Sequence, residues 1–599
     1  MAGGNDKNDR EIRRRASLIR RLQSLARPVL HNDQLVLLIL SIAAAAAAAY
    51  GAIAFRELYL SNRFFAFGTT SEELYSHVET LTIWHRVLAP TLGGLLVGLL
   101  IRYLMPEQRP EGVPDVMEAV ALRSGAMTAR AGISAAIISA TSIGFGASVG
   151  REGPVVHLGA TLSSLLAQKI GLSRSQTITL IGCGAAAAVS SSFNAPIAGV
   201  FFALEVVIGH YALSAFAPIV IASVVGTMIS RTHFGDFPAF IIPGNTSVSP
   251  FEFPGFILLG ILCAATAVIF MKSVAATRAA AQRIPGPAWW RPMYGGLFIG
   301  LIAIPLPHVL GVGYGATDAT LKGLFPLELL IMLVVAKLAA TAISIGSGFG
   351  GGVFSPSLFM GAVLGASFGI IATAIAPEYS SGVVSYALVG MGAVAGSVLG
   401  APISTILIIF ELSANYSLTI AVMIGVVVAS VITQQFTHKS FFLWQLSIRG
   451  IDLKEGRESR FLDAVLVSKV MKAEYTSIPV SADMKTVRDA LISAPGGILF
   501  ILESGQAVSA TITLPDLPAG TTGGELSAGQ IARPNPPVIR ASDNIGDALQ
   551  LIHESGEDHV GVVDDFETLR LIGLIHQSDI IVTYNRELLK ARQEERAEA

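Results

Sequence analysis

Hydrophobic segments recur along the chain from about residue 34 to residue 437, and a polar, periodic stretch follows them. The first segment, 34–54, has the length of about 20 residues that a membrane-spanning helix needs. Val87–Ile101 and Phe256–Met271 are also continuous, but many other segments are short and broken by Gly or Pro. Such pieces are typical of tilted, re-entrant or half-helices that are buried by protein. The pattern therefore predicts an α-helical polytopic membrane protein of the pore or transporter kind.

The stretch after residue 447 predicts a soluble α/β unit. FILES, VSATIT and HVGVVDD have the pattern of strands, and TVRDALI and NIGDALQLIHESG have that of helices. The unit is itself repeated, because VMKAEYTSIPVSADMKTVRDAL is answered by IARPNPPVIRASDNIGDAL. We therefore expect four parts: a basic N-terminal segment (1–33), a membrane domain (34–446), a two-copy α/β unit (447–585, copies at about 465–520 and 527–585) and a charged tail (586–599), which we expect to be a frayed helix.

Composition agrees with a membrane protein: 52% of the 599 residues are hydrophobic, 14% are charged and the mean hydropathy is +0.61. Arginines precede the first apolar run, which predicts a cytoplasmic N-terminus, namely Arg10, Arg13, Arg14, Arg15, Arg20, Arg21 and Arg27. Nucleic-acid binding, the alternative for such a cluster, is disfavoured by the adjacent membrane segment. With the α/β unit also cytoplasmic, the number of crossings is even. The two cysteines, Cys183 and Cys263, suggest neither a disulfide framework nor a metal site.

One charged residue, Glu152, lies inside a glycine-rich break, SIGFGASVGREGPVVHLG at 142–159. An ionisable group within a membrane costs about 2.5 kcal/mol or more and marks a functional site. Pro154 suits the first turn of a helix running from Val155 to Ala167. Glu152 is thereby placed at a helix N-terminus, whose free N–H groups and roughly half a positive charge attract anions. We expect its carboxylate to compete with a dissolved anion for this position.

The break occurs twice. SIGSGFGGGVFSPSLFMG at 344–361 aligns with it at an offset of 202, so that Gly150 matches Gly352 and Glu152 matches Phe354. IGCGAAAA at 181–188 answers VGMGAVAG at 389–396, and NAPIAGVFFALE at 194–205 answers GAPISTILIIFE at 400–411. Two halves with broken helices in corresponding positions indicate a substrate site where the repeats meet. Packing of glycine-rich helices is the plainer interpretation, but it leaves the buried charge unexplained.

Taken together, GREGP at 150–154, GVFSP at 352–356 and the paired AP…E segments resemble the CLC family of chloride channels and chloride/proton exchangers, followed by a pair of CBS domains. The resemblance spans roughly 80–590. It implies a fold of two inverted repeats with broken, tilted helices, a pore in each monomer and a homodimer. It also implies a multi-pass protein of the bacterial inner membrane, with both termini cytoplasmic and lipid around it.

The resemblance also implies the site. Glu152 would be the protonatable gate, and the anion would be held by backbone N–H groups near the breaks and around a proline loop. The anion-binding positions are then Glu111, Gly112, Val113, Arg151, Glu152, Gly153, Val353, Phe354 and Phe442. Chloride or another small anion is the expected partner, with protons acting at the gate.

Glu111 departs from the family pattern. It lies in Pro110-Glu111-Gly112-Val113-Pro114, where the family has Gly-Ser-Gly-Ile-Pro. A carboxylate 4 Å from a chloride would repel it by about 4 kcal/mol at an effective dielectric constant of 20. Glu111 is therefore turned aside, protonated, or an occasional occupant of the anion site. Alternatively, it stabilises the N-terminus of the helix that runs through Val120, a contribution of about 0.3–1 kcal/mol.

Two further departures concern the anion and the proton. Phe442 stands where the family has an anion-coordinating tyrosine, which removes a hydroxyl group. Val206 stands where exchangers often carry an internal proton-transferring glutamate, just after Glu205. We interpret Glu205 and Glu411, which correspond in the repeat, as structural carboxylates near helix ends. His157 is a candidate for proton movement, although a hydrogen-bonded packing histidine is the interpretation we favour.

In CBS modules an Asp after Thr-x-x commonly holds a nucleotide ribose. Thr513 and Asp516 fit this pattern, and in the second copy Asp579 remains while His576 replaces the threonine. The resemblance thus implies an adenine nucleotide as a candidate ligand, with a ligand-free platform for dimerisation and gating as the alternative.

The leading hypothesis is a passive anion channel of CLC type, gated by Glu152 and regulated by the CBS pair. The alternatives are an anion/proton antiporter on the same fold and a non-conducting, membrane-bound nucleotide sensor. The sequence contains no catalytic triad, no phosphate-binding loop with its lysine and no cluster of metal ligands, so we expect neither an enzyme nor a metal site.

Overall fold

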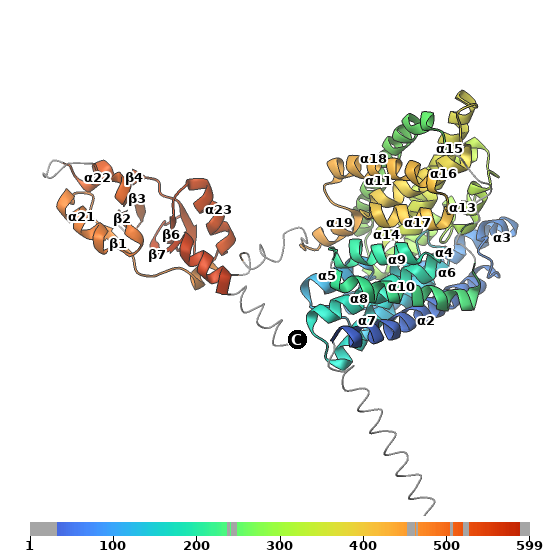
Figure 1. The fold of residues 1–599 in the computed structure, drawn as a ribbon, viewed down its shortest axis with the longest axis horizontal. Coiled ribbons are helices and arrows are strands. Elements are labelled where there is room, and N and C mark those ends of the chain that lie inside the picture. Colours follow the sequence, from blue (N-terminus) through green and yellow to red (C-terminus); the bar gives the residue numbers. More distant parts are fainter. Residues whose placement is uncertain are drawn as a thin grey trace, which may run out of the picture. The chain divides into compact units, whose positions relative to one another are not determined.

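The computed structural model describes residues 33–211, 213–236, 240, 248–451, 462, 465–503, 507–518 and 526–586. The chain divides into two compact units, Met1–Ile451 and Asp452–Ala599 (Figure 1). The N-terminal arginines and the charged tail beyond residue 586 lie outside the described residues. The predictions made for them are therefore untested.

The first unit is helical throughout its described part. Its α-helices are α2 (Asp33–Phe67), α3 (Leu74–Thr80), α4 (Ile83–Leu104), α5 (Val113–Leu122), α6 (Ala129–Gly144), α7 (Glu152–Ile170), α8 (Arg174–Phe193), α9 (Pro196–Phe202), α10 (Leu213–Phe234), α11 (Phe253–Arg283), α12 (Arg291–Ile302), α13 (Tyr314–Leu321), α14 (Leu327–Ser347), α15 (Phe354–Ile375), α16 (Val383–Leu399), α17 (Pro402–Ser413), α18 (Tyr416–Thr437) and α19 (Phe441–Ser447). A π-helical turn, Ala203–Ile208, follows α9.

Within the described residues, seven helical segments are long and apolar enough to cross a membrane, and three apolar segments are shorter. The continuous runs expected from the sequence lie in α4 and α11. The first helix, in contrast, continues to Phe67, well beyond the run 34–54. Polar residues on this extension remain helical because they have partners: Arg56 pairs with Glu72 at 2.8 Å, and Arg63 donates to the Ser71 carbonyl at 2.7 Å.

The two copies of the glycine-rich break lie against each other. Gly150 and Gly352 form an antiparallel bridge through two backbone hydrogen bonds of 2.6 and 2.8 Å. The next element begins beside this bridge in each half, α7 at Glu152 and α15 at Phe354. The repeat interface predicted from the sequence is therefore the place where two helix N-termini meet.

Small residues allow the helices after each break to pack backbone to backbone. A Cβ atom on Gly159 of α7 would lie 2.6 Å from the Gly184 carbonyl oxygen of α8, and one on Gly361 of α15 would lie 2.2 Å from the Gly390 carbonyl oxygen of α16. Close approach of this kind is how membrane helices gain contact without a hydrophobic driving force. It fixes the position of α7 and α15 and hence of the residues at their N-termini.

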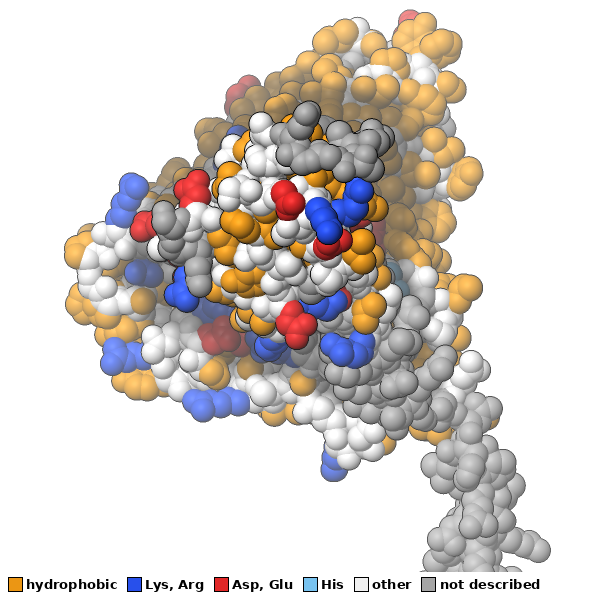
Figure 2. All heavy atoms as spheres, turned by 90° about the vertical axis from the view of Figure 1, so that its left-hand side faces the viewer, with side chains coloured by type: hydrophobic (Ala, Val, Ile, Leu, Met, Phe, Trp, Pro, Cys, Tyr) orange, Lys and Arg blue, Asp and Glu red, His pale blue; other side chains and the backbone are white. Residues whose placement is uncertain are grey.

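The second unit contains two related lobes. The first has the sheet order β1–β2–β3–β4 (Thr476–Ile478, Ile498–Leu502, Val508–Thr513, Arg533–Pro534), and the second has β5–β6–β7 (Val538–Arg540, His559–Val563, Leu571–His576). Helices α21 (Met484–Ser493), α22 (Ala528–Ile531) and α23 (Ile545–Ser555) complete them. In both lobes the first pair of strands is parallel and the next is antiparallel. In Figure 2 charged side chains are scattered over the described surface of this unit, whereas the visible surface of the membrane unit is mainly hydrophobic.

Candidate functional site

Glu152 is the first residue of α7 and is buried, with 4% of its surface exposed. Two hydroxyl groups donate to its Oε1 atom: Tyr314 at 2.8 Å and Ser355 at 2.5 Å. Its Oε2 atom has no hydrogen-bond partner among the described residues. Hydrogen bonds to a charged group contribute about 1.5–3 kcal/mol each. The carboxylate is thus held by one oxygen while the other remains unsatisfied.

Sequence reasoning missed both hydroxyl groups. Ser355 directly follows Phe354 in the repeated GVFSP motif, so its position in the site was available from the repeat. Tyr314 is 162 residues from Glu152 and begins the short helix α13. Nothing in the sequence near Tyr314 marks it as a partner of Glu152.

Arg151 precedes Glu152 and is also buried. Its Nη1 atom donates to the Tyr59 hydroxyl at 3.0 Å and lies 3.4 Å from Glu72 Oε1, and its guanidinium stacks on Tyr314 at 4.4 Å. These contacts hold the side chain against α2 and the segment after it. Arg151 is absent from the walls of both the small cavity beside Glu152 and the larger cavity that adjoins it, so the structure does not support the expectation that it contacts the anion.

A small cavity of about 20 Å³ lies beside Glu152. The predicted residues that line it are Val113, Glu152, Gly153, Val353, Phe354 and Phe442. Three of these lie at helix N-termini, Val113 on α5, Glu152 on α7 and Phe354 on α15. A cavity needs about 10–15 Å³ to hold one water molecule, so this space has room for one water molecule or one small ion. Converging N-termini favour an anion there.

The small cavity adjoins a larger one of about 240 Å³, which we call the vestibule. The two share Val113, Gly153, Gly352, Val353 and Phe442. The vestibule is lined by five arginines and two acidic residues, namely Arg102, Arg109, Arg278, Arg291, Arg449, Glu111 and Asp115. Gly112 lines it as well. A cleft with this excess of positive charge concentrates anions.

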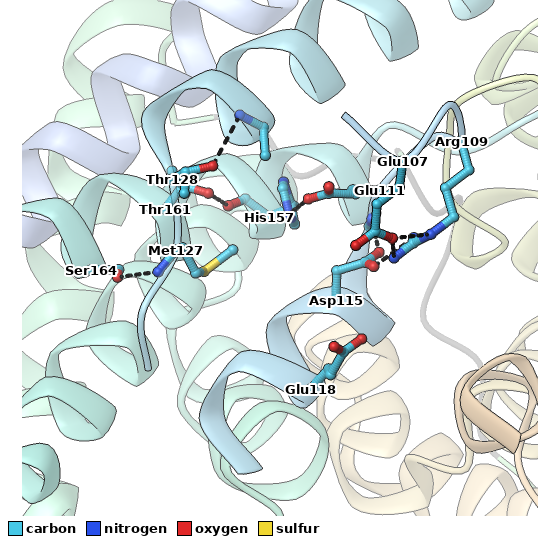
Figure 3. A network of polar contacts seen from close by, with 12 residues as sticks. Glu107, Arg109, Glu111, Asp115, Glu118, Met127, Thr128, His157, Thr161 and Ser164 are labelled. Carbon is cyan, nitrogen blue, oxygen red and sulfur yellow. Dashed lines mark hydrogen bonds and ion pairs between the residues drawn. The ribbon is translucent and has the colours of Figure 1, made fainter. Parts of the chain in front are cut away.

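Glu111 lies in the wall of the vestibule and is turned toward His157 rather than toward the helix N-terminus beside it (Figure 3). Asp115 caps α5 instead, accepting from the Gly112 N–H at 2.7 Å. The distance from Glu111 Oε2 to His157 Nε2 is 3.2 Å. The described residues thus show no hydrogen bond from the start of α5 to Glu111, and the helix-cap interpretation gains no support. The expectation of a hydrogen-bonded packing histidine was wrong, since neither His157 ring nitrogen forms a well-aligned hydrogen bond within the described part of the chain.

Val206 lies buried in the π-helical turn, with 5% of its surface exposed. Glu205, beside it, accepts from the Ile403 and Ser404 N–H groups at 3.1 and 2.8 Å, at the start of α17. Reciprocally, Glu411 accepts from the Ile197 and Ala198 N–H groups at 2.9 and 2.8 Å, at the start of α9. Each glutamate thus caps a helix of the opposite half, in agreement with a structural role.

In the C-terminal unit the candidate nucleotide residues already have partners. Asp516 Oδ2 accepts from the Thr513 N–H at 2.8 Å and its hydroxyl at 2.7 Å, and Oδ1 pairs with Arg533 at 2.5 Å. Asp579 pairs with Lys472 at 2.9 Å, and its buried Oδ2 atom has no hydrogen-bond partner among the described residues. A ligand could bind to Asp516 Oδ1 only if Arg533 moved away from it. No group of three metal-ligating side chains occurs within the described ranges.

A buried carboxylate where helix N-termini from two repeated halves meet defines a membrane protein with an ion pathway. The sequence comparisons identify the family. Residues 93–434 match the voltage-gated chloride channel family, and residues 528–585 match the CBS domain. The chain belongs to the voltage-gated chloride channel (CLC) family, whose members are channels and transporters and not enzymes. The resemblance noted from the sequence is confirmed.

Individual relatives agree. A ClcB-like chloride channel protein of Ralstonia nicotianae is 35% identical over 383 residues, which are 63% of this chain and 89% of the relative. The voltage-gated ClC-type chloride channel ClcB of Escherichia coli is 29% identical over 398 residues, covering 66% and 95%. Among solved structures, a cyanobacterial Cl⁻/H⁺ antiporter superposes with a TM-score of 0.63 at 21% identity, covering 69% and 97%. A CLC-type fluoride/proton antiporter gives 0.57 at 24%, covering 68% and 96%. The predicted fold class is thereby confirmed.

Proposed function

We propose that this protein is a passive anion channel, with chloride as the leading candidate ion, and that Glu152 is its gate. The observation that carries the proposal is the position of the Glu152 carboxylate at the edge of a cavity large enough for one small particle. An anion reaches this cavity from the arginine-lined vestibule. It passes further only when the carboxylate leaves or is protonated, because two negative charges do not share one low-dielectric site.

The absence of an internal proton carrier favours a channel over an exchanger. Coupled exchange needs a second titratable group on the path, and valine at position 206 cannot carry a proton. Glu205 cannot replace it in this arrangement, because its carboxylate caps α17. An antiporter is the second candidate. Glu111 and His157 favour it, as titratable groups beside the vestibule, and two structurally similar proteins are described as antiporters.

Anion flux into liposomes under separate chloride and pH gradients tests the proposal. We expect the reversal potential to equal that of chloride, and we expect Glu152→Gln to remove the dependence of flux on external pH. A neutral amide neither competes with the anion nor changes charge. Proton uptake driven uphill by a chloride gradient, at a fixed ratio to the anion, would reject the channel in favour of the antiporter. Unchanged pH dependence in Glu152→Gln would reject the gate.

We also propose that the protein is a homodimer of the bacterial inner membrane with both termini in the cytoplasm. The exposed apolar side chains of α10 and α18, including Met228, Met423 and Val427, suit contact with lipid or a second copy. The CBS pair would then act from the cytoplasm through α19, which ends the membrane unit. Asp579 is the better candidate for an adenine nucleotide, because one of its oxygens lacks a donor.

A further inference from the structure

Besides the small cavity and the vestibule, a further cavity of about 200 Å³ lies next to the vestibule. We call it the second cavity. The two cavities share three charged residues: Arg109, Glu111 and Asp115. On the far side the second cavity is lined by α6 and α7, including His157 and Thr161. Its volume accommodates several water molecules, since one needs about 10–15 Å³. Glu111 therefore stands between a space for water and the path that we propose for the anion.

His157 lies at the wall of this cavity and is fully buried. Its Nδ1 atom has no hydrogen-bond partner among the described residues, and its Nε2 atom lies 3.2 Å from Glu111 Oε2 without good hydrogen-bond alignment (Figure 3). A buried polar atom left without a partner costs about 1–3 kcal/mol. Water in the cavity, or a proton shared with Glu111, would satisfy the ring.

The neighbouring carboxylates differ from Glu111 in their counter-ions. Glu107 and Asp115 both pair with Arg109, at 2.6 and 2.7 Å, and Asp115 also pairs with Arg449 at 2.7 Å. The remaining acid of this network, Glu118, pairs with Arg123, whose side chain also lines the cavity. Arginine remains charged at all relevant pH values. Within the described network, Glu111 is the acid whose ion-pair partner is a histidine, so its compensation alone depends on pH.

We propose that Glu111 and His157 form a proton-binding site that controls access of anions to the vestibule. A hydronium ion in the second cavity loses one O–H bond and becomes a water molecule, and the pair gains one N–H or O–H bond. The net charge of the pair changes from −1 to 0, and repulsion of anions in the vestibule falls. The proposal rests on the proposed anion conduction and deepens it: cytoplasmic acidification would raise flux through a site separate from Glu152.

Direct transfer of this proton to the gate is disfavoured by helix geometry. His157 follows Glu152 by five residues on α7, about 7.5 Å along the axis and about 140° around it. The two side chains therefore lie on different faces of the helix. The pair acts through its charge and is not a step in a continuous proton path.

The test uses the full chain in phosphatidylethanolamine/phosphatidylglycerol liposomes, in a Glu152→Gln background that lacks the gating carboxylate. Chloride flux is measured with equal pH on both sides, from pH 7.5 to 5.5. We expect flux to rise about tenfold on acidification, the lower end of what a charged cleft does to the access of small ions. Adding Glu111→Gln should give high flux that no longer depends on pH. Adding His157→Gln should keep flux low across this whole pH range, because the pair then lacks the imidazole that shares the proton with Glu111.

The control is Glu107→Gln, which removes a carboxylate lining the same cavity and should leave the pH dependence as in the parent. Calorimetric titration of chloride in detergent at pH 7.5 and 5.5 provides a readout that needs no conduction. A protein that does not conduct, but whose chloride affinity rises on acidification only when Glu111 is present, would reject the channel and support this site. The proposal would be overturned if chloride flux still depended on pH in Glu111→Gln, or if this dependence disappeared equally in Glu107→Gln. Uphill proton uptake that is lost with Glu111→Gln would overturn it in favour of proton transfer.

Discussion

Removing the Tyr314 hydroxyl tests whether the observed position of Glu152 is the closed state of a gate. Tyr314→Phe deletes the 2.8 Å hydrogen bond to Oε1 and keeps the ring that stacks on Arg151. Ser355 then remains as a donor. The substitution therefore weakens the docked carboxylate without opening a cavity.

The size of the effect follows from the hydrogen bond. A donor to a charged group contributes about 1.5–3 kcal/mol. Since 1.36 kcal/mol corresponds to one pH unit, the midpoint of the external pH dependence should move by about one to two units. The shift is toward alkaline pH, because the donor stabilises the charged, docked form and its loss makes protonation and release easier. At neutral pH the fraction of open protein should rise about tenfold or more.

The assay is chloride efflux from liposomes as a function of external pH, with voltage set by a potassium ionophore. Tyr386→Phe is the matched control, since Tyr386 is a buried tyrosine of the same unit that packs against Phe256 and Phe368 and lines neither the small cavity nor the vestibule. Flux with an unchanged midpoint in both Tyr314→Phe and Ser355→Ala would refute the view that these hydroxyl groups hold a closed gate.

Glu411→Ala leaves the Ile197 and Ala198 N–H groups without their acceptor and should destabilise the membrane unit by about 1–3 kcal/mol. Its Tm should fall while the anion selectivity stays the same. An equal fall in Tm in the control Glu378→Ala, at an exposed site, would contradict this prediction. In the C-terminal unit, burial lowers the pKa of His559 below its ordinary value, so the unfolded chain binds this proton more readily. Stability should therefore fall as pH drops through about 6.5. Hydrogen exchange of β6 in the full chain should report the loss; His559→Gln should abolish it, and His553→Gln at an exposed site should not.

Much of the site could be predicted because it depends on residues that are close together in the sequence. A charge inside an apolar segment, glycines that break a helix and a proline that starts one are all adjacent in the chain, so their physical cost is visible without a structure. The repeat added the long-range information, since two copies of one broken helix imply that the breaks face each other. The bridge between Gly150 and Gly352 agrees with this expectation.

The partners of these residues could not be predicted, because they come from elements that share no pattern with them. Tyr314 reaches Glu152 from a short helix outside the repeated motifs. Glu111 and His157 are far apart in sequence, and each had a reasonable local role, as a helix cap and as a packing histidine. Because α5 packs against α7, the two side chains instead lie next to each other.

By itself, the sequence determined that the chain spans a membrane in two related halves, with one carboxylate at their junction, and that a two-lobed α/β unit follows them in the sequence. These features depend on the cost of burying charge and on helix-breaking residues, which act locally. Only the tertiary structure decided which hydroxyl groups hold Glu152, that Arg151 contacts Tyr59 and Tyr314, and that Glu111 lies beside His157. Such pairings depend on the crossing and spacing of helices, which are set by contacts summed over the whole unit.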